Sequence, residues 1–161
     1  MTVQPNMNLD AQLCYALYAA SRAMTSCYRP LLEAIGLTYP QYLVMLVLWE
    51  DGDVSVGHLG QRLALESGTL SPLLKRLESA GLITRRRRQD DERSVQVELT
   101  PDGRALRDQA VTVPTKVIEA TGTPLPELLA LRDALQTLTA RLRAETELPS
   151  GEAADVPGVV R

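Results

Sequence analysis

The stretch SVGHLGQRLALESGTLSPLLKRLESAGLITRRRRQDDERSVQVELT, residues 55–100, decides the fold because three patterns follow one another in it. Ser55 can cap a short helix whose apolar positions have helical spacing. A second helix is predicted from the i, i+3, i+4, i+7 spacing of Leu70, Leu73, Leu74 and Leu77. After Gly81 the period changes to two, which is typical of a half-buried strand over residues 95–99. Residues 82–88 are then its predicted partner strand, with a turn at residues 89–92.

Two short helices followed by a two-stranded ribbon make a winged helix-turn-helix, which is a DNA-binding arrangement. Small side chains on the outer face of the second helix would let it lie deep in the major groove. Arginines on a narrow ribbon suit phosphate contact or insertion into the minor groove. The predicted DNA-binding residues are Ser67, Thr69, Ser71, Pro72, Lys75, Arg76, Arg85, Arg86, Arg87, Arg88 and Arg93.

The charge of the protein is consistent with a local rather than a global DNA-binding surface. The whole chain carries a formal net charge of -3, yet residues 58–107 hold ten of the 17 Lys and Arg and seven of the 20 acids. The segment is therefore net positive within an acidic protein. An alternative is a solvated hairpin whose charges pair with one another. Its position directly after a helix-turn-helix pattern favours the DNA interpretation.

Helices are predicted on both sides of this region, so the fold class is mainly α with a small β-hairpin. A helix over residues 9–31 and a last helix over residues 125–142 each carry a long leucine stripe, which predicts a dimer interface. The run YLVMLVLW, residues 42–49, is apolar on every side and predicts a central core helix, opened by Thr38 or Tyr39 with Pro40 in its first turn. Thr100 and Pro101 open a further helix, which Pro114 bends or ends.

The predicted organisation has four parts. Residues 1–35 form an N-terminal dimerisation and sensor helix, and residues 36–100 form the winged helix-turn-helix. Residues 101–148 form C-terminal dimerisation helices, and residues 149–161 form a disordered tail.

Composition excludes several classes of protein. Two cysteines are too few for a secreted disulfide scaffold, and no signal peptide or membrane span is visible, so a cytoplasmic location is expected. His58 is the only histidine and has no neighbouring ligands, so no metal is expected. The residues show no catalytic constellation and no cofactor motif, which indicates that the protein is not an enzyme.

Both cysteines, Cys14 and Cys27, and all five tyrosines lie between residues 9 and 42. A thiol senses peroxide only as a thiolate, and phenol hydroxyls can donate hydrogen bonds to one. Cys27 lies on the apolar stripe of the first helix and is interpreted as structural. Cys14 lies beside the stripe, and the residues alone favour an inert thiol there. Tyr15 and Tyr42 are interpreted as packing or surface residues.

The stretch DDERSVQVELTPDGRAL, residues 90–106, resembles the wing and following helix of MarR-type repressors, with Asp91 and Arg93 in the wing motif. Three further stretches are similar to the organic hydroperoxide resistance regulators, a peroxide-sensing branch of that family. They are LDAQLCYALYAASRAM, LTYPQYLVMLVLWE and SGTLSPLLKRLESAGLITR. The resemblance runs from about residue 9 to residue 115.

This resemblance implies a homodimeric repressor that binds double-stranded operator DNA when reduced and leaves it when an organic hydroperoxide oxidises Cys14. It also implies that Tyr28 and Tyr39 support the thiolate, that Tyr18 is a further member of the site, and that Arg93 is the wing arginine. A low-molecular-weight thiol is a further expected partner. The alternative is a MarR-type repressor released by a small phenolic or lipophilic ligand, with Cys14 incidental.

Two residues depart from the expected pattern of this branch, and one distance constrains the site. Glu66 stands where an aspartate is expected beside the second helix of the helix-turn-helix, and Cys27 is not expected. On a continuous first helix, Cys14 and Tyr28 would lie about 21 Å apart, so contact between them would require the partner subunit.

Overall fold

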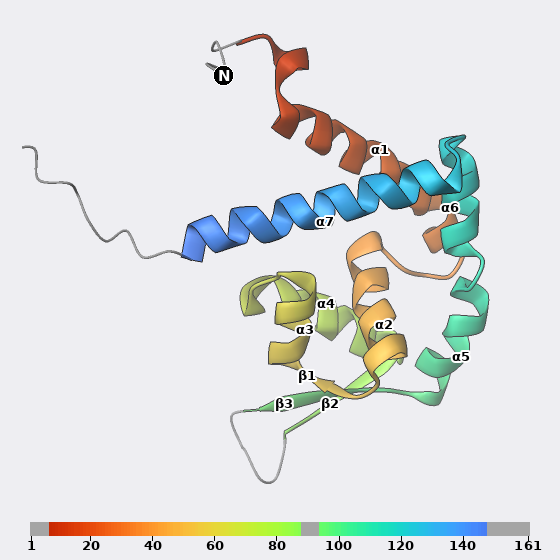
Figure 1. Ribbon diagram of the computed structural model, residues 1–161. Helices are drawn as coiled ribbons and strands as arrows, with labels where there is room; N and C mark the ends of the chain where they lie inside the picture. Colours follow the sequence, from red (N-terminus) through yellow and green to blue (C-terminus); the bar gives the residue numbers. More distant parts are fainter. Residues whose placement is uncertain (1–6, 88–93, 148–161) are drawn as a thin grey trace, which may run out of the picture. The chain divides into compact units, whose positions relative to one another are not determined.

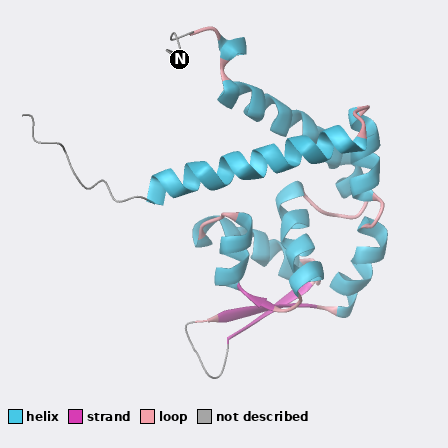
Figure 2. Cartoon of the chain, viewed as in Figure 1, coloured by secondary structure: helices cyan, strands magenta, loops and turns pink. Residues whose placement is uncertain are grey.

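The computed structural model describes residues 7–87 and 94–147 (Figure 1). The expectations for Arg88, Asp91, Arg93, the turn at residues 89–92 and the tail therefore lie outside the described residues. The chain divides into two compact units, Met1–Ala120 and Thr121–Arg161, which are treated separately. Helices dominate what is described, with a small sheet beside them (Figure 2).

The first helix begins later than its periodicity predicts. A single 3-10 turn, η1 (Leu9–Ala11), is followed by Gln12 in an extended conformation, and α1 spans Leu13–Glu33. The prediction of one helix from Leu9 is wrong at this end. Leu9 and Leu13 are both more than half exposed, so no packing within the chain holds these residues to a helical path. Pro30 lies inside the last turns of α1 and does not end it.

Helix α2 (Tyr39–Asp51) is the predicted core helix. Thr38 is its N-cap, and the Thr38 backbone N–H donates to Oε1 of Gln41 over 2.8 Å in a capping box. Its buried side chains point in several directions around the axis: Gln41, Tyr42, Val44, Met45, Val47 and Leu48. A helix buried on most sides organises the core, and helices that precede and follow it in the chain pack against it.

Helices α3 (Val56–Leu63) and α4 (Ser67–Ser79) form the predicted helix-turn-helix. Ser55 Oγ accepts a hydrogen bond from the His58 backbone N–H at 3.1 Å, as expected of an N-cap. The side chains that α3 and α4 turn to the core are at most 1% exposed: Leu59, Leu70, Leu74 and Leu77. The leucine spacing therefore predicted the buried face correctly.

The wing is a pair of antiparallel strands, β2 (Ile83–Arg87) and β3 (Val95–Leu99), in register from Ile83↔Leu99 to Arg87↔Val95. A short strand, β1 (Val54–Ser55), pairs with the other edge of β3, so the order in the described sheet is β1-β3-β2. The sequence predicted the two wing strands but missed β1, because two residues carry no readable period.

Helix α5 (Pro101–Ala110) begins as predicted, with Thr100 Oγ1 accepting from the Gly103 N–H at 3.0 Å. Pro114 lies in the first turn of a separate helix, α6 (Val113–Thr121), so the helix before it has ended. In the second unit, α7 (Leu125–Glu147) has no buried side chain among those described. No helix in the described part of the chain is both long and apolar enough to cross a bilayer.

Candidate DNA-binding face and thiol site

The outer face of α4 carries the side chains that the sequence assigned to the major groove. All of the following are exposed: Ser67, Thr69, Ser71, Pro72, Lys75 and Arg76. They alternate around the helix with the buried leucines, so one side of α4 packs against the core and the other side is exposed. A helix held in this way can present short polar and basic groups to base edges and phosphates.

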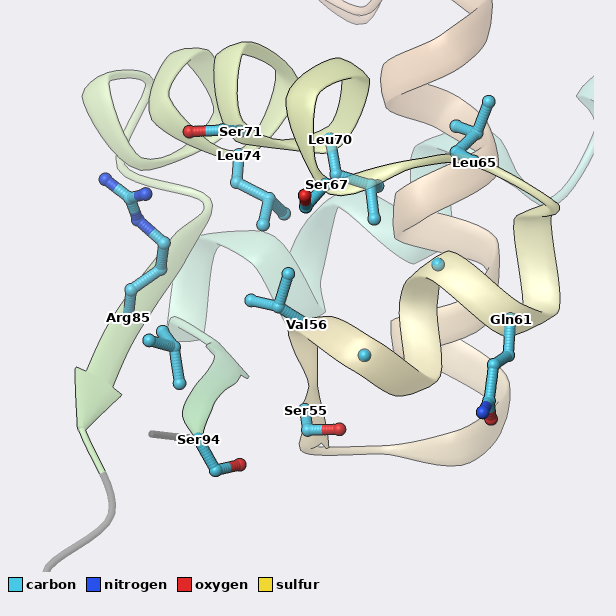
Figure 3. A pocket seen from close by; sticks show the side chains of 13 residues that line it. Ser55, Val56, Gln61, Leu65, Ser67, Leu70, Ser71, Leu74, Arg85 and Ser94 are labelled. Carbon is cyan, nitrogen blue, oxygen red and sulfur yellow. The ribbon is translucent and has the colours of Figure 1, made fainter. Parts of the chain in front are cut away.

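A groove of about 770 Å³ separates this helix from the wing (Figure 3). Its walls come from the start of α3, the first half of α4, and strands β2 and β3. Ser55, Ser67, Ser71 and Ser94 line it together with Arg85, and valine and leucine side chains make most of its surface apolar. The groove therefore lies between the two predicted DNA-contacting elements.

The described wing arginines have different surroundings. Arg85 donates from Nε and Nη2 to Oε2 of Glu78 over 3.0 and 2.7 Å, and its backbone N–H donates to Oε1 over 3.2 Å. These hydrogen bonds, together with the positive charge of Arg85, hold the pKa of the Glu78 carboxyl below its usual range. Arg86 is 72% exposed, and its Nε lies 3.6 Å from Glu98 Oε2. Arg87 is also exposed.

Both thiols are exposed and lie on α1. Cys14 is the second residue of this helix, and Cys27 lies thirteen residues further on. The continuous helix separates them by about 20 Å along its axis. A disulfide needs Cα atoms within about 7 Å, so the two cysteines of one chain cannot pair.

Two of the three predicted thiolate-supporting tyrosines lie side by side. The Tyr28 ring is 4.9 Å from that of Tyr39 and 5.9 Å from that of Tyr42, and Tyr42 meets Trp49 edge-on at 6.3 Å. Burial raises the pKa of Tyr28 and of Tyr39, and it raises the pKa of Tyr42 to about 12. These phenols therefore keep their protons at neutral pH and remain hydrogen-bond donors.

Tyr42 was expected to be a packing or surface residue, and it is buried. Its contact with the Tyr28 ring was not predicted from the sequence. The spacing along the chain could have predicted it, because Tyr42 follows Tyr39 by three residues and both rings therefore lie on one face of α2.

Tyr18 lies outside this cluster, in the N-terminal half of α1. The residue is 58% exposed, its hydroxyl accepts from Arg22 Nη1 at 3.1 Å, and the Arg22 guanidinium lies 5.6 Å from the ring centre. Sequence reasoning missed Arg22, although the i, i+4 spacing from Tyr18 was a visible signal. Tyr18 and Cys14 are themselves four residues apart, on one face of the same helix.

The single histidine makes a hydrogen bond to a carboxylate that also pairs with an arginine, and it does not lie in a cluster of metal ligands. His58 Nε2 lies 2.7 Å from Asp51 Oδ2, and Arg62 Nε lies 3.1 Å from the same oxygen. The hydrogen bond to His58 and the charge of Arg62 lower the pKa of Asp51. Among the described residues, no three His, Cys, Asp or Glu side chains gather in a way that could hold a metal ion.

A second cavity, of about 400 Å³, lies between α2, α5 and α6. Tyr42, Leu46 and Trp49 form its aromatic and apolar wall, and Glu50 and Arg107 provide charges. An aromatic wall beside a cationic side chain suits a small amphipathic molecule.

Comparison with known proteins places this arrangement in a family. The family model of the SarA/Rot transcriptional regulators matches residues 26–110, which is more than half of the chain. The chain is 48% identical over 133 residues to the organic hydroperoxide resistance transcriptional regulator of Bacillus subtilis, covering 83% of this chain and 90% of that protein. It is 49% identical over 149 residues to the HTH-type transcriptional regulator TtmR of Methylorubrum extorquens, covering 91% of this chain and 76% of that protein.

Solved structures agree with these relatives. The structure of reduced AbfR bound to DNA superposes with a TM-score of 0.69 at 35% identity, over 84% of this chain and 95% of that one. AbfR comes from Staphylococcus epidermidis. The exposed face of α4, the wing and these relationships lead to one conclusion. The chain belongs to the MarR-type family of winged-helix transcriptional regulators that bind DNA, in its organic hydroperoxide resistance regulator branch.

Proposed function

We propose that the protein is a homodimeric repressor that senses organic hydroperoxides by oxidation of Cys14 and then releases its operator. One observation carries this proposal: an exposed thiol lies at the start of α1, and a cluster of protonated tyrosines lies near the other end of the same helix. Cys14 and Tyr28 are about 21 Å apart along this uninterrupted helix. They can meet only if a second copy of α1 runs antiparallel to the first.

The dimer is supported by apolar side chains that the single chain leaves in water. On α1 these include Leu13 and Met24, and on α7 they include Leu125, Leu131 and Leu142. Apolar side chains exposed in stripes along long helices are typical of interfaces between subunits. A two-fold dimer would bury the α1 stripe on its own copy, and would place Tyr28 and Tyr39 of one subunit near Cys14 of the other.

The sensing step follows from thiol chemistry. The Cys14 thiolate attacks an oxygen of the hydroperoxide, the O–O bond breaks, and the alcohol leaves after taking up a proton. The sulfur becomes a sulfenic acid and the peroxide is reduced. Tyrosine hydroxyls that donate to the thiolate would favour the reactive form, and their rings would admit the organic part of the peroxide.

The fate of the sulfenic acid is limited by the cysteines that remain. Residues 28–161 contain no cysteine, and Cys27 of the same chain is too distant. The expected second step is attack by a low-molecular-weight thiol, which forms a mixed disulfide and releases water. Such a step suits a compartment that keeps thiols reduced, such as the cytoplasm.

A relative suggests which product releases DNA. AbfR has been solved as an overoxidised form bound to DNA and also as a disulfide form. By analogy, we expect the bulky mixed disulfide, rather than added oxygen atoms, to separate the two α4 helices. Their spacing matters because a dimer reads half-sites about one helical turn, or ~34 Å, apart.

The test compares two thiols on one helix. Wild type, Cys14→Ser and Cys27→Ser are bound to DNA from upstream of the protein's own gene and treated with cumene hydroperoxide plus a small thiol. Wild type and Cys27→Ser should release the DNA, and Cys14→Ser should stay bound. A strong cross-linked dimer on a non-reducing gel, absent in Cys27→Ser, would show instead that Cys27 of the partner resolves the sulfenic acid.

The second cavity favours a different inducer. Its aromatic wall and Arg107 fit a small phenolic acid or lipophilic ligand, which would release DNA without thiol chemistry. Alkylation of the thiols separates the two accounts. The ligand-responsive repressor would be favoured by two results together. The untreated protein would stay on DNA in the presence of peroxide, and the alkylated protein would still leave DNA when such a ligand is added.

A further inference from the structure

We propose that Glu78 and Arg85 form a clamp that positions the wing against α4, and that Arg85 contributes to operator affinity through this geometry rather than by touching a phosphate. Arg85 is then a positioning residue, although its place in a run of four arginines predicted direct binding to DNA. The inference rests on operator binding by the proposed repressor and is independent of its peroxide sensing.

The clamp spans the joint between α4 and the wing. Glu78 lies in the last turn of α4, and Arg85 is the third residue of β2. Both carboxylate oxygens of Glu78 accept from Arg85, one from the side chain and one from the backbone. A guanidinium and a backbone N–H held by one carboxylate fix both the position and the direction of the strand.

The joint itself is short and fixed by the backbone. Gly81 adopts φ +72°, its N–H donates to the Glu78 carbonyl, and the Leu82 N–H donates to the Leu77 carbonyl over 3.0 Å. These bonds end the helix, but they lie before the strand. The hydrogen bonds between Glu78 and Arg85 hold β2 itself, at its third residue. A small change in the direction of the strand there would move the whole ribbon.

The alternation of side chains along β2 separates Arg85 from its neighbour. Arg85 lies on the same face as Ile83, which is buried, and Arg86 lies on the opposite face. The exposed fraction of the side chain is 31% for Arg85 and 72% for Arg86. Arg85 also lines the groove beside Ser71 of α4 (Figure 3). The ribbon therefore directs Arg85 towards the helix, whereas the more exposed Arg86 lies on the other face, with its Nε 3.6 Å from Glu98 Oε2.

The two possible roles of this pair predict opposite signs for one substitution. Glu78 is an acid near the DNA-facing groove, so its charge alone repels phosphate. If the pair did not position the wing, Glu78→Gln would leave operator binding unchanged or strengthen it. If the pair is a clamp, the same substitution weakens a charge-assisted hydrogen bond and therefore weakens operator binding.

The experiment measures the binding of the full-length protein to two duplexes over a range of salt concentrations. One duplex is enriched by the wild-type protein from a random library, and the other is an unselected sequence of equal length. Glu78→Gln should bind the selected duplex at least about fivefold more weakly, the size expected for the net loss of one ordinary hydrogen bond. Its affinity for the unselected duplex should equal that of wild type or exceed it, because a negative charge that repels phosphate is gone, and its salt slope should not fall. Equal or tighter binding to the selected duplex would overturn the clamp.

Arg85→Lys is the second variant, because it keeps the positive charge and removes the two-point geometry. It should behave like Glu78→Gln, and wild-type affinity would contradict the proposal. Arg86→Ala is the matched control on the opposite face. It should weaken binding to both duplexes and lower the salt slope by about 0.9 for each phosphate that the protein no longer neutralises. An equal loss of affinity for both duplexes in Arg85→Lys would also refute the positioning role.

Exchanging the two charges distinguishes loss of the pair from misfolding of the variant. Arg85→Glu alone should abolish selective binding, and adding Glu78→Arg should restore part of it. The exchange rebuilds the side-chain pair in reverse, but an arginine at position 78 cannot accept from the backbone N–H of residue 85. No recovery in a double variant that melts like wild type would assign Arg85 to the DNA itself. A wild-type protein that binds the selected duplex but ignores peroxide would refute the proposed sensor function and leave this test intact.

Discussion

Replacing Gly103 with alanine should destabilise the protein strongly, because α5 meets the base of the wing at this residue. A Cβ on Gly103 would fall well inside van der Waals distance of the Leu82 carbonyl oxygen and lie 3.2 Å from Leu99 Cδ2. The obstructing atom is backbone, so no side chain can rotate away. Leu82 also accepts from the Thr100 N–H, which fixes that carbonyl in place.

The magnitude follows from three contributions. Overpacking against a fixed backbone atom costs about 3 kcal/mol, the upper end for such substitutions. A shift of α5 also weakens the bond from Trp49 Nε1 to the Gly103 carbonyl, which is 2.9 Å long and contributes about 1 kcal/mol. Alanine favours the helix by about 1 kcal/mol, which offsets part of the destabilisation. The net expectation is a free energy of unfolding lower by about 3 kcal/mol.

Urea unfolding at one fixed protein concentration measures this change, and the melting temperature should fall by about 6–12 °C. Gly68→Ala is the matched control. Gly68 is also helical, and a Cβ there meets no atom within 4 Å, so this substitution should stabilise the protein by up to about 1 kcal/mol. A Gly103→Ala protein within about 0.5 kcal/mol of wild type would refute the close approach of α5 to Leu82.

Three further outcomes are expected. Burial raises the pKa of Tyr42 to about 12, so the folded state holds this proton more tightly than the unfolded state does. The resulting contribution to the free energy of unfolding is complete below pH 10 and is lost as the pH rises towards 12. The difference in unfolding free energy between pH 8 and pH 11 should therefore shrink in Tyr42→Phe, and an unchanged difference would count against burial. Tyr28→Phe should keep operator affinity and slow the oxidation of Cys14 by peroxide, followed by thiol titration; a wild-type rate would exclude its hydroxyl from tuning the thiolate. Arg93→Ala should weaken operator binding by about 1–3 kcal/mol, and unchanged affinity at physiological salt would remove this wing arginine from recognition.

Sequence patterns predicted the elements that depend on neighbouring residues. The helix starts at Thr38, Ser55 and Thr100 and the leucine stripe of α4 are all local, and each is present in the structure. Thr38, one of two candidate caps, is the N-cap, and the capping box that it forms with Gln41 was not predicted. The pattern failed at Leu9, where no core enforces the helical period, and at β1, which is too short to show one. The roles of Cys14, the tyrosines and the DNA-contacting residues stay predictions.

The sequence by itself determined the winged helix-turn-helix, because caps, periods and turn residues act within a few positions and each can be read along the chain. Only the tertiary structure decided which arginine of the wing faces α4 and pairs with Glu78, that Tyr42 completes the ring cluster of Tyr28 and Tyr39, and that α5 approaches Leu82 too closely for any residue but glycine at position 103. The physical reason is that these interactions join separate elements. Their distances depend on how helices and strands pack around α2, and no spacing along the chain records that packing.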